Sequence, residues 1–86
     1  MQIPKILNAE ASDDKMLTIV FTNGEKKIYD VSKLWNNEMF APLKNPSFFK
    51  NVKVEKGGYA VYWNDKIDIS EYELWKNGRN FQVAYR

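Results

Sequence analysis

Alternating apolar residues before an Asn-Gly pair constrain the fold of this chain more than any other feature. Residues 15–22 alternate as a half-buried strand does. Asn23-Gly24 follows, and this pair is typical of a type I′ hairpin turn, in which both central residues need positive φ. A two-residue turn at these positions places Ile19 opposite Ile28. Because side chains alternate between the two faces of a strand, this register also decides which residues share a face. The predicted core face of this hairpin consists of Leu17, Ile19, Phe21 and Ile28.

Two further turns predict a second set of antiparallel strands. Gly57-Gly58 would place Val54 opposite Val61, and a loop over 64–66 would place Ile69 opposite Val61 as well. Residues 3–10 add a further apolar segment, and Pro4 confines it to a strand start or a sheet edge, since proline cannot donate a hydrogen bond to a neighbouring strand.

Residues typical of helix beginnings and helix ends lie between these predicted strands. Ser32 is expected to cap a short helical turn, and Asn45-Pro46 has an N-cap residue followed by proline at the first helical position. Ser70 and Glu73 have capping-box spacing, and Gly78 is placed to end that helix. The residues expected to pack over the sheet between the first two helices are Met39, Phe40 and Leu43.

Length and composition fit one folded domain over residues 1–86. The chain has 86 residues, of which 44% are hydrophobic and 15% aromatic, and it contains no cysteine. We predict an α+β fold: a small antiparallel β-sheet built from hairpins, with about five to six strands and two to three short helices on one face. Residues 79–86 are expected to form an extra C-terminal strand. The lack of cysteine and of a long apolar segment favours the cytoplasm and predicts no membrane association.

The residue types present exclude several kinds of catalytic site. Without His or Cys the chain cannot form a Ser-His-Asp or Cys-His site, or a zinc site that needs either ligand. Gly57-Gly58 also lacks the Lys and Ser/Thr of a phosphate-binding P-loop. We therefore expect no enzymatic activity and no cofactor or metal. Asp65 and Asp68, with Asp30, are the remaining acidic candidates for acid-base or cation chemistry, but carboxylates at turns and helix starts usually have a local structural role.

An aromatic surface offers an alternative function. Tyr59 and Tyr62, with Lys53 and Lys56, would suit single-stranded nucleic acid, whose bases stack on aromatic rings. The net charge is only +2, from 13 basic and 11 acidic residues, which lacks the basic excess typical of such proteins.

The C-terminal segment suits binding to another protein. Phe81, Val83 and Tyr85 would form an apolar row on a strand with free backbone groups, which favours strand addition to a partner or to a second copy in a homodimer. The other interpretation is pairing at the edge of the chain's own sheet.

The order of these elements resembles a known bacterial family. A strand through Leu17 to Asn23-Gly24, then Asp30-Val31-Ser32, Phe40-x-x-Leu43 and Pro46-x-x-Phe49, and finally Val52-x-Val54, Trp63, Asp68-Ile69-Ser70 and Leu74 are similar to domain of unknown function 2442 over about residues 3–75. The resemblance implies a compact α+β domain with no assigned activity and no established site residues. It also implies relatives that are encoded beside another small protein in what look like toxin-antitoxin pairs. We therefore predict a non-enzymatic protein-interaction or regulatory domain, antitoxin-like in role.

Overall fold

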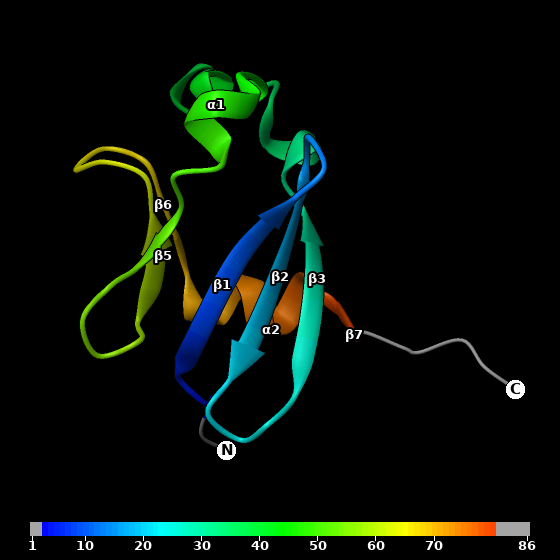
Figure 1. The fold of residues 1–86 in the computed structure, drawn as a ribbon, viewed down its shortest axis with the longest axis vertical. Coiled ribbons are helices and arrows are strands. Elements are labelled where there is room, and N and C mark those ends of the chain that lie inside the picture. Colours follow the sequence, from blue (N-terminus) through cyan, green and yellow to red (C-terminus); the bar gives the residue numbers. More distant parts are fainter. Residues whose placement is uncertain (1–2, 81–86) are drawn as a thin grey trace, which may run out of the picture.

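The strands form two antiparallel sheets in the computed structural model, which describes residues 3–80 (Figure 1). The first sheet has the order β1-β2-β3-β7, formed by Ile6–Ser12, Met16–Phe21, Lys26–Asp30 and Arg79–Asn80. The second sheet has the order β4-β5-β6, formed by Lys53–Val54, Ala60–Tyr62 and Asp68–Ser70. The predicted α+β class is confirmed, with the strands divided between two sheets. The predicted edge strand is β1.

The predicted register of the first hairpin is wrong by one residue. Leu17 lies opposite Tyr29, and Ile19 lies opposite Lys27. The amide of Phe21 donates to the carbonyl of Glu25, so the loop has three residues, and of the Asn-Gly pair only Gly24 has positive φ. A three-residue hairpin loop of this kind typically has a type I turn followed by a residue in the left-handed region, which here is Gly24. Tyr29 therefore enters the core, and Ile28 faces the other side.

The predicted pairings in the second sheet are confirmed. Val54 and Ile69 both lie opposite Val61, on neighbouring strands. The amide of Trp63 donates to the carbonyl of Ile67, which closes the three-residue loop. Val61 on β5 and Ile69 on β6 are consequently both buried in the core.

Short helices connect the two sheets at one end of the molecule (Figure 1). They are two 3-10 segments, η1 and η2, and one helical turn, α1, formed by Val31–Leu34, Glu38–Lys44 and Pro46–Phe49. Asn45 caps α1 as predicted. The cap of η1 is Asp30 rather than Ser32, because the Asp30 carboxylate accepts from both the amide and the hydroxyl of Ser32. In η2 Leu43 is fully buried, whereas Met39 remains 57% exposed.

Helix α2, Glu71–Asn77, packs across the inner face of the first sheet (Figure 1). Ser70 caps it, since the Ser70 hydroxyl accepts from the amide of Glu73. Gly78 ends the helix with an extended φ of −74°. A side chain there would lie 2.5 Å from the carbonyl oxygen of Leu74, so the glycine is needed for close approach and not for a left-handed turn.

One apolar core joins both sheets and the helices. Its fully buried members include Leu17, Ile19, Phe21, Tyr29, Val31, Leu43, Phe49, Val61 and Leu74. The indole N–H of Trp63 donates to the carbonyl of Phe49 at 2.8 Å, which gives a buried polar group its partner. In residues 3–80 no helix has the length and apolar character needed to cross a membrane.

Candidate functional site

An open hollow of about 600 Å³ lies where the N-terminal segment meets the start of α2. We call it the tyrosine groove, and its lining consists of Ile3, Pro4, Lys5, Thr22, Tyr59, Glu71 and Tyr72. These residues come from the chain before β1, the end of β2, the loop before β5 and the first turn of α2. The groove therefore depends on both sheets.

Close contact between β1 and the Gly57-Gly58 turn brings Tyr59 to the groove. The amide of Ile6 donates to the carbonyl of Gly58 at 2.9 Å. A Cβ at Gly58 would lie 2.6 Å from the Ile6 carbonyl oxygen, and φ at this position is +79°. Only glycine combines this φ with this approach at little cost. Gly58 therefore fixes the distance between the two sheets at the groove.

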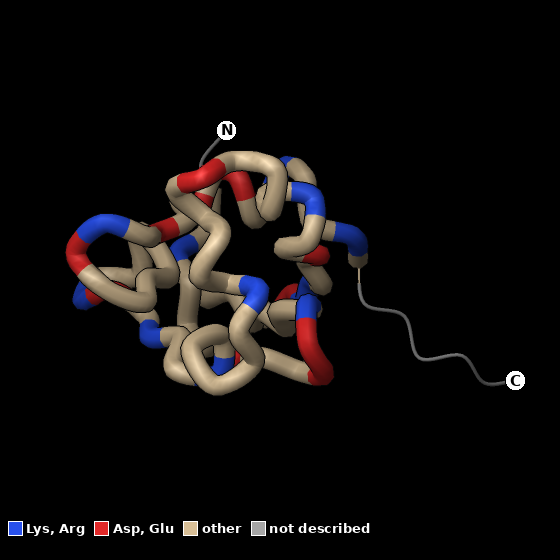
Figure 2. Tube along the Cα trace, turned by 90° about the horizontal axis from the view of Figure 1, so that it is seen from above, with Lys and Arg blue, Asp and Glu red and all other residues tan. Residues whose placement is uncertain are grey.

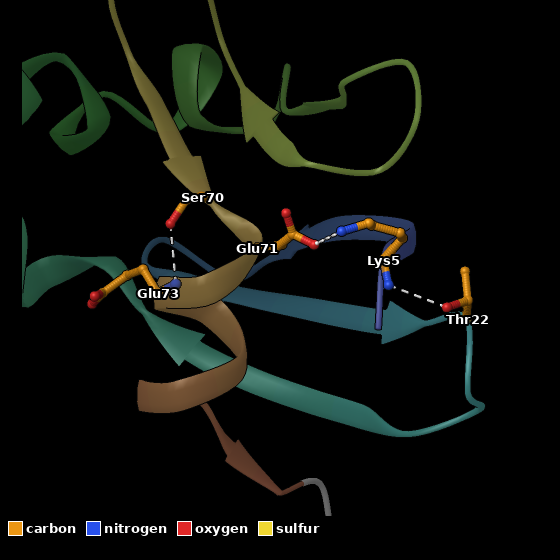
Figure 3. A network of polar contacts seen from close by, with 5 residues as sticks. All are labelled: Lys5, Thr22, Ser70, Glu71 and Glu73. Carbon is orange, nitrogen blue, oxygen red and sulfur yellow. Dashed lines mark hydrogen bonds and ion pairs between the residues drawn. The ribbon is translucent and has the colours of Figure 1, made fainter. Parts of the chain in front are cut away.

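Two lining residues of the groove, Lys5 and Glu71, form an ion pair (Figure 3). The Lys5 ammonium lies 2.7 Å from the Glu71 carboxylate and 4.2 Å from the centre of the Tyr59 ring. The Lys5 side chain is 40% exposed and that of Glu71 only 14%. The Glu71 amide also donates to the carbonyl of Tyr59, so side chain and backbone both connect α2 to the neighbouring segments. Glu71 lies in the first turn of α2, where the helix dipole favours a carboxylate.

Backbone bonds hold Lys5 in place. Its amide donates to the Thr22 hydroxyl at 3.2 Å (Figure 3), and the Thr22 amide donates to the Lys5 carbonyl at 2.8 Å. The segment before β1 thus continues the pairing of the first sheet. The backbone of Lys5 is therefore fixed beside the groove.

Two tyrosine rings form the exposed wall of the groove. Tyr59 is 54% and Tyr72 52% exposed, and both are among the most exposed large apolar side chains of residues 3–80. The Tyr72 hydroxyl accepts from the Lys76 ammonium at 3.1 Å, a hydrogen bond that raises the pKa of Lys76. The rings offer apolar area and polar edges together, which suits binding more than bond-making chemistry.

The predicted aromatic and lysine face is divided in the structure. Tyr59 lies at the groove, whereas Tyr62 lies opposite Lys53 on the outer side of the second sheet. The Lys53 ammonium is 6.0 Å from the centre of the Tyr62 ring. Tyr62 and Lys56 share a smaller hollow of about 360 Å³ with the side chains of Glu55, Asn64, Asp65 and Asp68. Figure 2 shows basic and acidic residues interspersed along the described trace.

The acidic candidates do not form one cluster. Asp65 and Asp68 line that smaller hollow, while Asp30 lies at the end of β3 in the other sheet. The side-chain hydrogen bond from Ser32 lowers the pKa of Asp30, as expected for a helix-capping carboxylate. Among residues 3–80 there is no group of three acidic side chains placed to hold a metal ion.

The C-terminal segment begins inside the chain's own sheet. Arg79 and Asn80 pair with Ile28 and Lys27 as β7. The predicted interaction residues Phe81, Val83 and Tyr85 lie outside the described residues.

Sequence patterns did not identify Lys5, Glu71 and Tyr72 as site residues. Glu71 and Tyr72 follow a recognisable helix cap, which could have marked Tyr72 as a residue outside the core stripe. Lys5 is 66 positions from Glu71, and no local pattern predicts that pairing.

Fold and groove together define a small two-sheet α+β domain with one helix packed across the larger sheet. The chain belongs to the family described as protein of unknown function DUF2442, whose model matches residues 6–80. That match includes β7 and so extends beyond the limit near residue 75 expected from the sequence. No curated protein and no solved structure matches the chain.

Proposed function

We propose that this chain is a non-enzymatic protein-interaction or regulatory domain whose tyrosine groove receives a partner protein. The observation that supports this most is the pair of half-exposed rings, Tyr59 and Tyr72, on one hollow. Tyrosine is enriched at the centre of protein interfaces because it buries a large area with few rotatable bonds.

The ion pair in the groove lining supports the same proposal. Lys5 and Glu71 are already paired with each other, so neither charge needs a partner of its own when the surface is covered. A partner that covers the groove strengthens this attraction by excluding water. Hydrogen bonds of the Lys5 backbone already order this residue in the free chain. Less conformational entropy is therefore lost when a partner binds.

Two hypotheses from the sequence remain part of the proposal. One is that Phe81, Val83 and Tyr85 add a strand to a partner or to a second copy. The other is an antitoxin-like role in a bacterial gene pair, in the cytoplasm, which rests on the family resemblance and on the absence of cysteine.

The test compares capture of binding proteins by matched tyrosine variants. Tyr59→Ser and Tyr72→Ser should each weaken capture of a partner by roughly tenfold or more, as expected for interface tyrosines. Tyr62→Ser is the control, because that ring lies on the other hollow. Equal capture by all three variants would refute the groove as the binding surface. Turnover of any substrate that is lost in a folded Asp68→Asn variant would refute the non-enzymatic proposal.

Nucleic-acid binding is the alternative, supported by the position of the Lys53 ammonium over the Tyr62 ring. Binding of this kind should weaken steeply with added salt and should be reduced by Lys53→Gln. The three carboxylates in the hollow beside Tyr62 would repel phosphate, which makes this alternative less favourable.

A further inference from the structure

Within residues 3–80, one face of the first sheet has no helix or strand packed over it (Figure 1). Helix α2 packs on its inner face, and the opposite face is open toward the viewer in Figure 1. We call this the outer face, and the residues used below are Glu10, Met16, Thr18, Val20, Ile28 and Arg79. Met16, Val20 and Ile28 are half-buried and are not members of the core. Lys26 and Asp30 project from the same side, opposite Val20 and Met16. A partly apolar sheet face of this kind is a surface that a second sheet can cover.

Four residues form one row across this face. Glu10 on β1 lies opposite Thr18, Thr18 lies opposite Ile28, and Ile28 lies opposite Arg79 on β7. Directly paired residues share a face, so all four side chains project from the same side. The row therefore has an acid at one end, a base at the other and uncharged residues between them.

The two charges cannot neutralise each other within one chain. Glu10 and Arg79 are three strand spacings apart, about 14 Å between backbones. Within residues 3–80 the ion pair of the chain is Lys5 with Glu71, and neither Glu10 nor Arg79 takes part in one. Both side chains are exposed.

We propose that a second copy of this chain packs face to face on the outer face, related by a two-fold axis that runs parallel to the strands. Such an axis reverses the strand order of the partner, so β1 of one copy lies over β7 of the other. It leaves the position along the strands unchanged, which puts Glu10 of each copy against Arg79 of the other. Two sheets packed about 10 Å apart allow these long side chains to meet.

The charges of the row also disfavour the other simple arrangement. A two-fold axis perpendicular to the strands would keep the strand order and place Glu10 and Arg79 each over its own copy, with like charges opposed. The same axis would bring Lys26 of each copy near Asp30 of the other, so it offers attractive and repulsive contacts together. The parallel axis opposes only unlike charges along the row, and opposite-charge contacts favour one orientation of an interface.

The size of the face sets the expected strength. The four strands have 7, 6, 5 and 2 residues and together cover roughly 300 Å², against roughly 800 Å² per partner in a typical stable complex. We expect a dissociation constant of roughly 10 µM to 1 mM, as for a weak or transient interface. This inference does not rest on the tyrosine groove.

Charge exchange between the two ends of the row tests the proposal in full-length protein. Sedimentation equilibrium up to about 2 mM should show a reversible dimer of the natural chain, a range set by the expected affinity. Glu10→Arg and Arg79→Glu should each weaken self-association roughly tenfold or more, because two contacts per dimer become repulsive. The double variant should regain the natural affinity. An equimolar mixture of the two single variants should form a heterodimer, since every facing pair is then of opposite charge.

The controls separate this surface from the others. Glu55→Arg and Lys56→Glu make the same charge changes in the turn between β4 and β5 and should leave self-association unchanged, as should Tyr59→Ser. Val20→Arg should abolish it in a folded chain, as judged by circular dichroism, because the new cation lies beside Lys26. A strict monomer at every concentration, or no recovery in either the double variant or the mixture, would overturn the proposal. Self-association that survives Val20→Arg but is lost in Val83→Asp would assign it to the C-terminal segment instead.

Discussion

The hydroxyl of Tyr29 donates a 2.6 Å hydrogen bond to the carboxylate of Glu73, and this contact fastens α2 to the centre of the first sheet. Tyr29 is 1% exposed. Glu73 also accepts from the side-chain amide of Asn77, one helical turn further along. The glutamate expected to reach back to its own helix cap thus bonds a residue 44 positions away.

Tyr29→Phe should destabilise the domain by about 1–3 kcal/mol, because the buried ring is retained while a hydrogen bond to a charged group is lost. Urea unfolding at neutral pH measures the change. Tyr62→Phe, on the outer side of the second sheet, is the control and should change the free energy of unfolding by under about 0.5 kcal/mol. Equal effects from the two substitutions would show that the Tyr29 hydrogen bond contributes nothing.

The same tyrosine should make stability depend on alkaline pH. Burial, and then the hydrogen bond to Glu73, raise the pKa of Tyr29 above its ordinary value of 10.0. The unfolded chain therefore loses this proton first as pH rises. The contribution is complete below about pH 10 and falls as pH increases above it. Unfolding free energies of the natural chain and of Tyr29→Phe should converge between about pH 10 and 11.5. A constant difference over this range would contradict the assignment.

Gly58 should tolerate substitution far less than Gly24. Both have positive φ, +79° and +91°, but a Cβ at Gly24 meets nothing within 4 Å, whereas one at Gly58 meets the backbone of Ile6. Gly24→Ala should cost about 1 kcal/mol for the backbone conformation alone. Gly58→Ala should cost about 3 kcal/mol or more, because β1 must move as well. Thermal unfolding of both variants compares the two effects, and similar losses would show that β1 can shift freely.

The two hairpins show what the sequence can and cannot determine about register. In the second sheet the apolar pattern allowed one alignment, and that alignment is confirmed. In the first hairpin, Ile28 and Tyr29 are neighbours and both are apolar enough for the core, so the pattern fits two registers. The Asn23 side chain accepts from the amide of Glu25, a local bond that accompanies the three-residue loop. The sequence alone could not rank that loop against the type I′ turn.

The site was less predictable than the fold. Tyr59 and Tyr62 are three positions apart, and such residues point to opposite sides of a straight strand, so one shared face was already unfavourable. The tyrosine groove instead joins residues near positions 3–5, 59 and 71–72. Their proximity depends on how the two sheets pack, which alternation within each strand does not specify.

Lys5→Met should loosen the N-terminal side of the groove with little effect on overall stability. Methionine keeps the apolar stem but loses the ion pair with Glu71, and the Lys5 side chain is 40% exposed, so the global cost should stay below about 1 kcal/mol. The Ile6 amide donates to the Gly58 carbonyl and the Thr22 amide to the Lys5 carbonyl. Both amide hydrogens should exchange with solvent faster in Lys5→Met than in the natural chain. Hydrogen exchange followed by NMR measures both amides. Lys53→Met is the matched control, since Lys53 lies on the second sheet, and should leave them unchanged. Unaltered protection in Lys5→Met would show that backbone pairing alone holds this side of the groove.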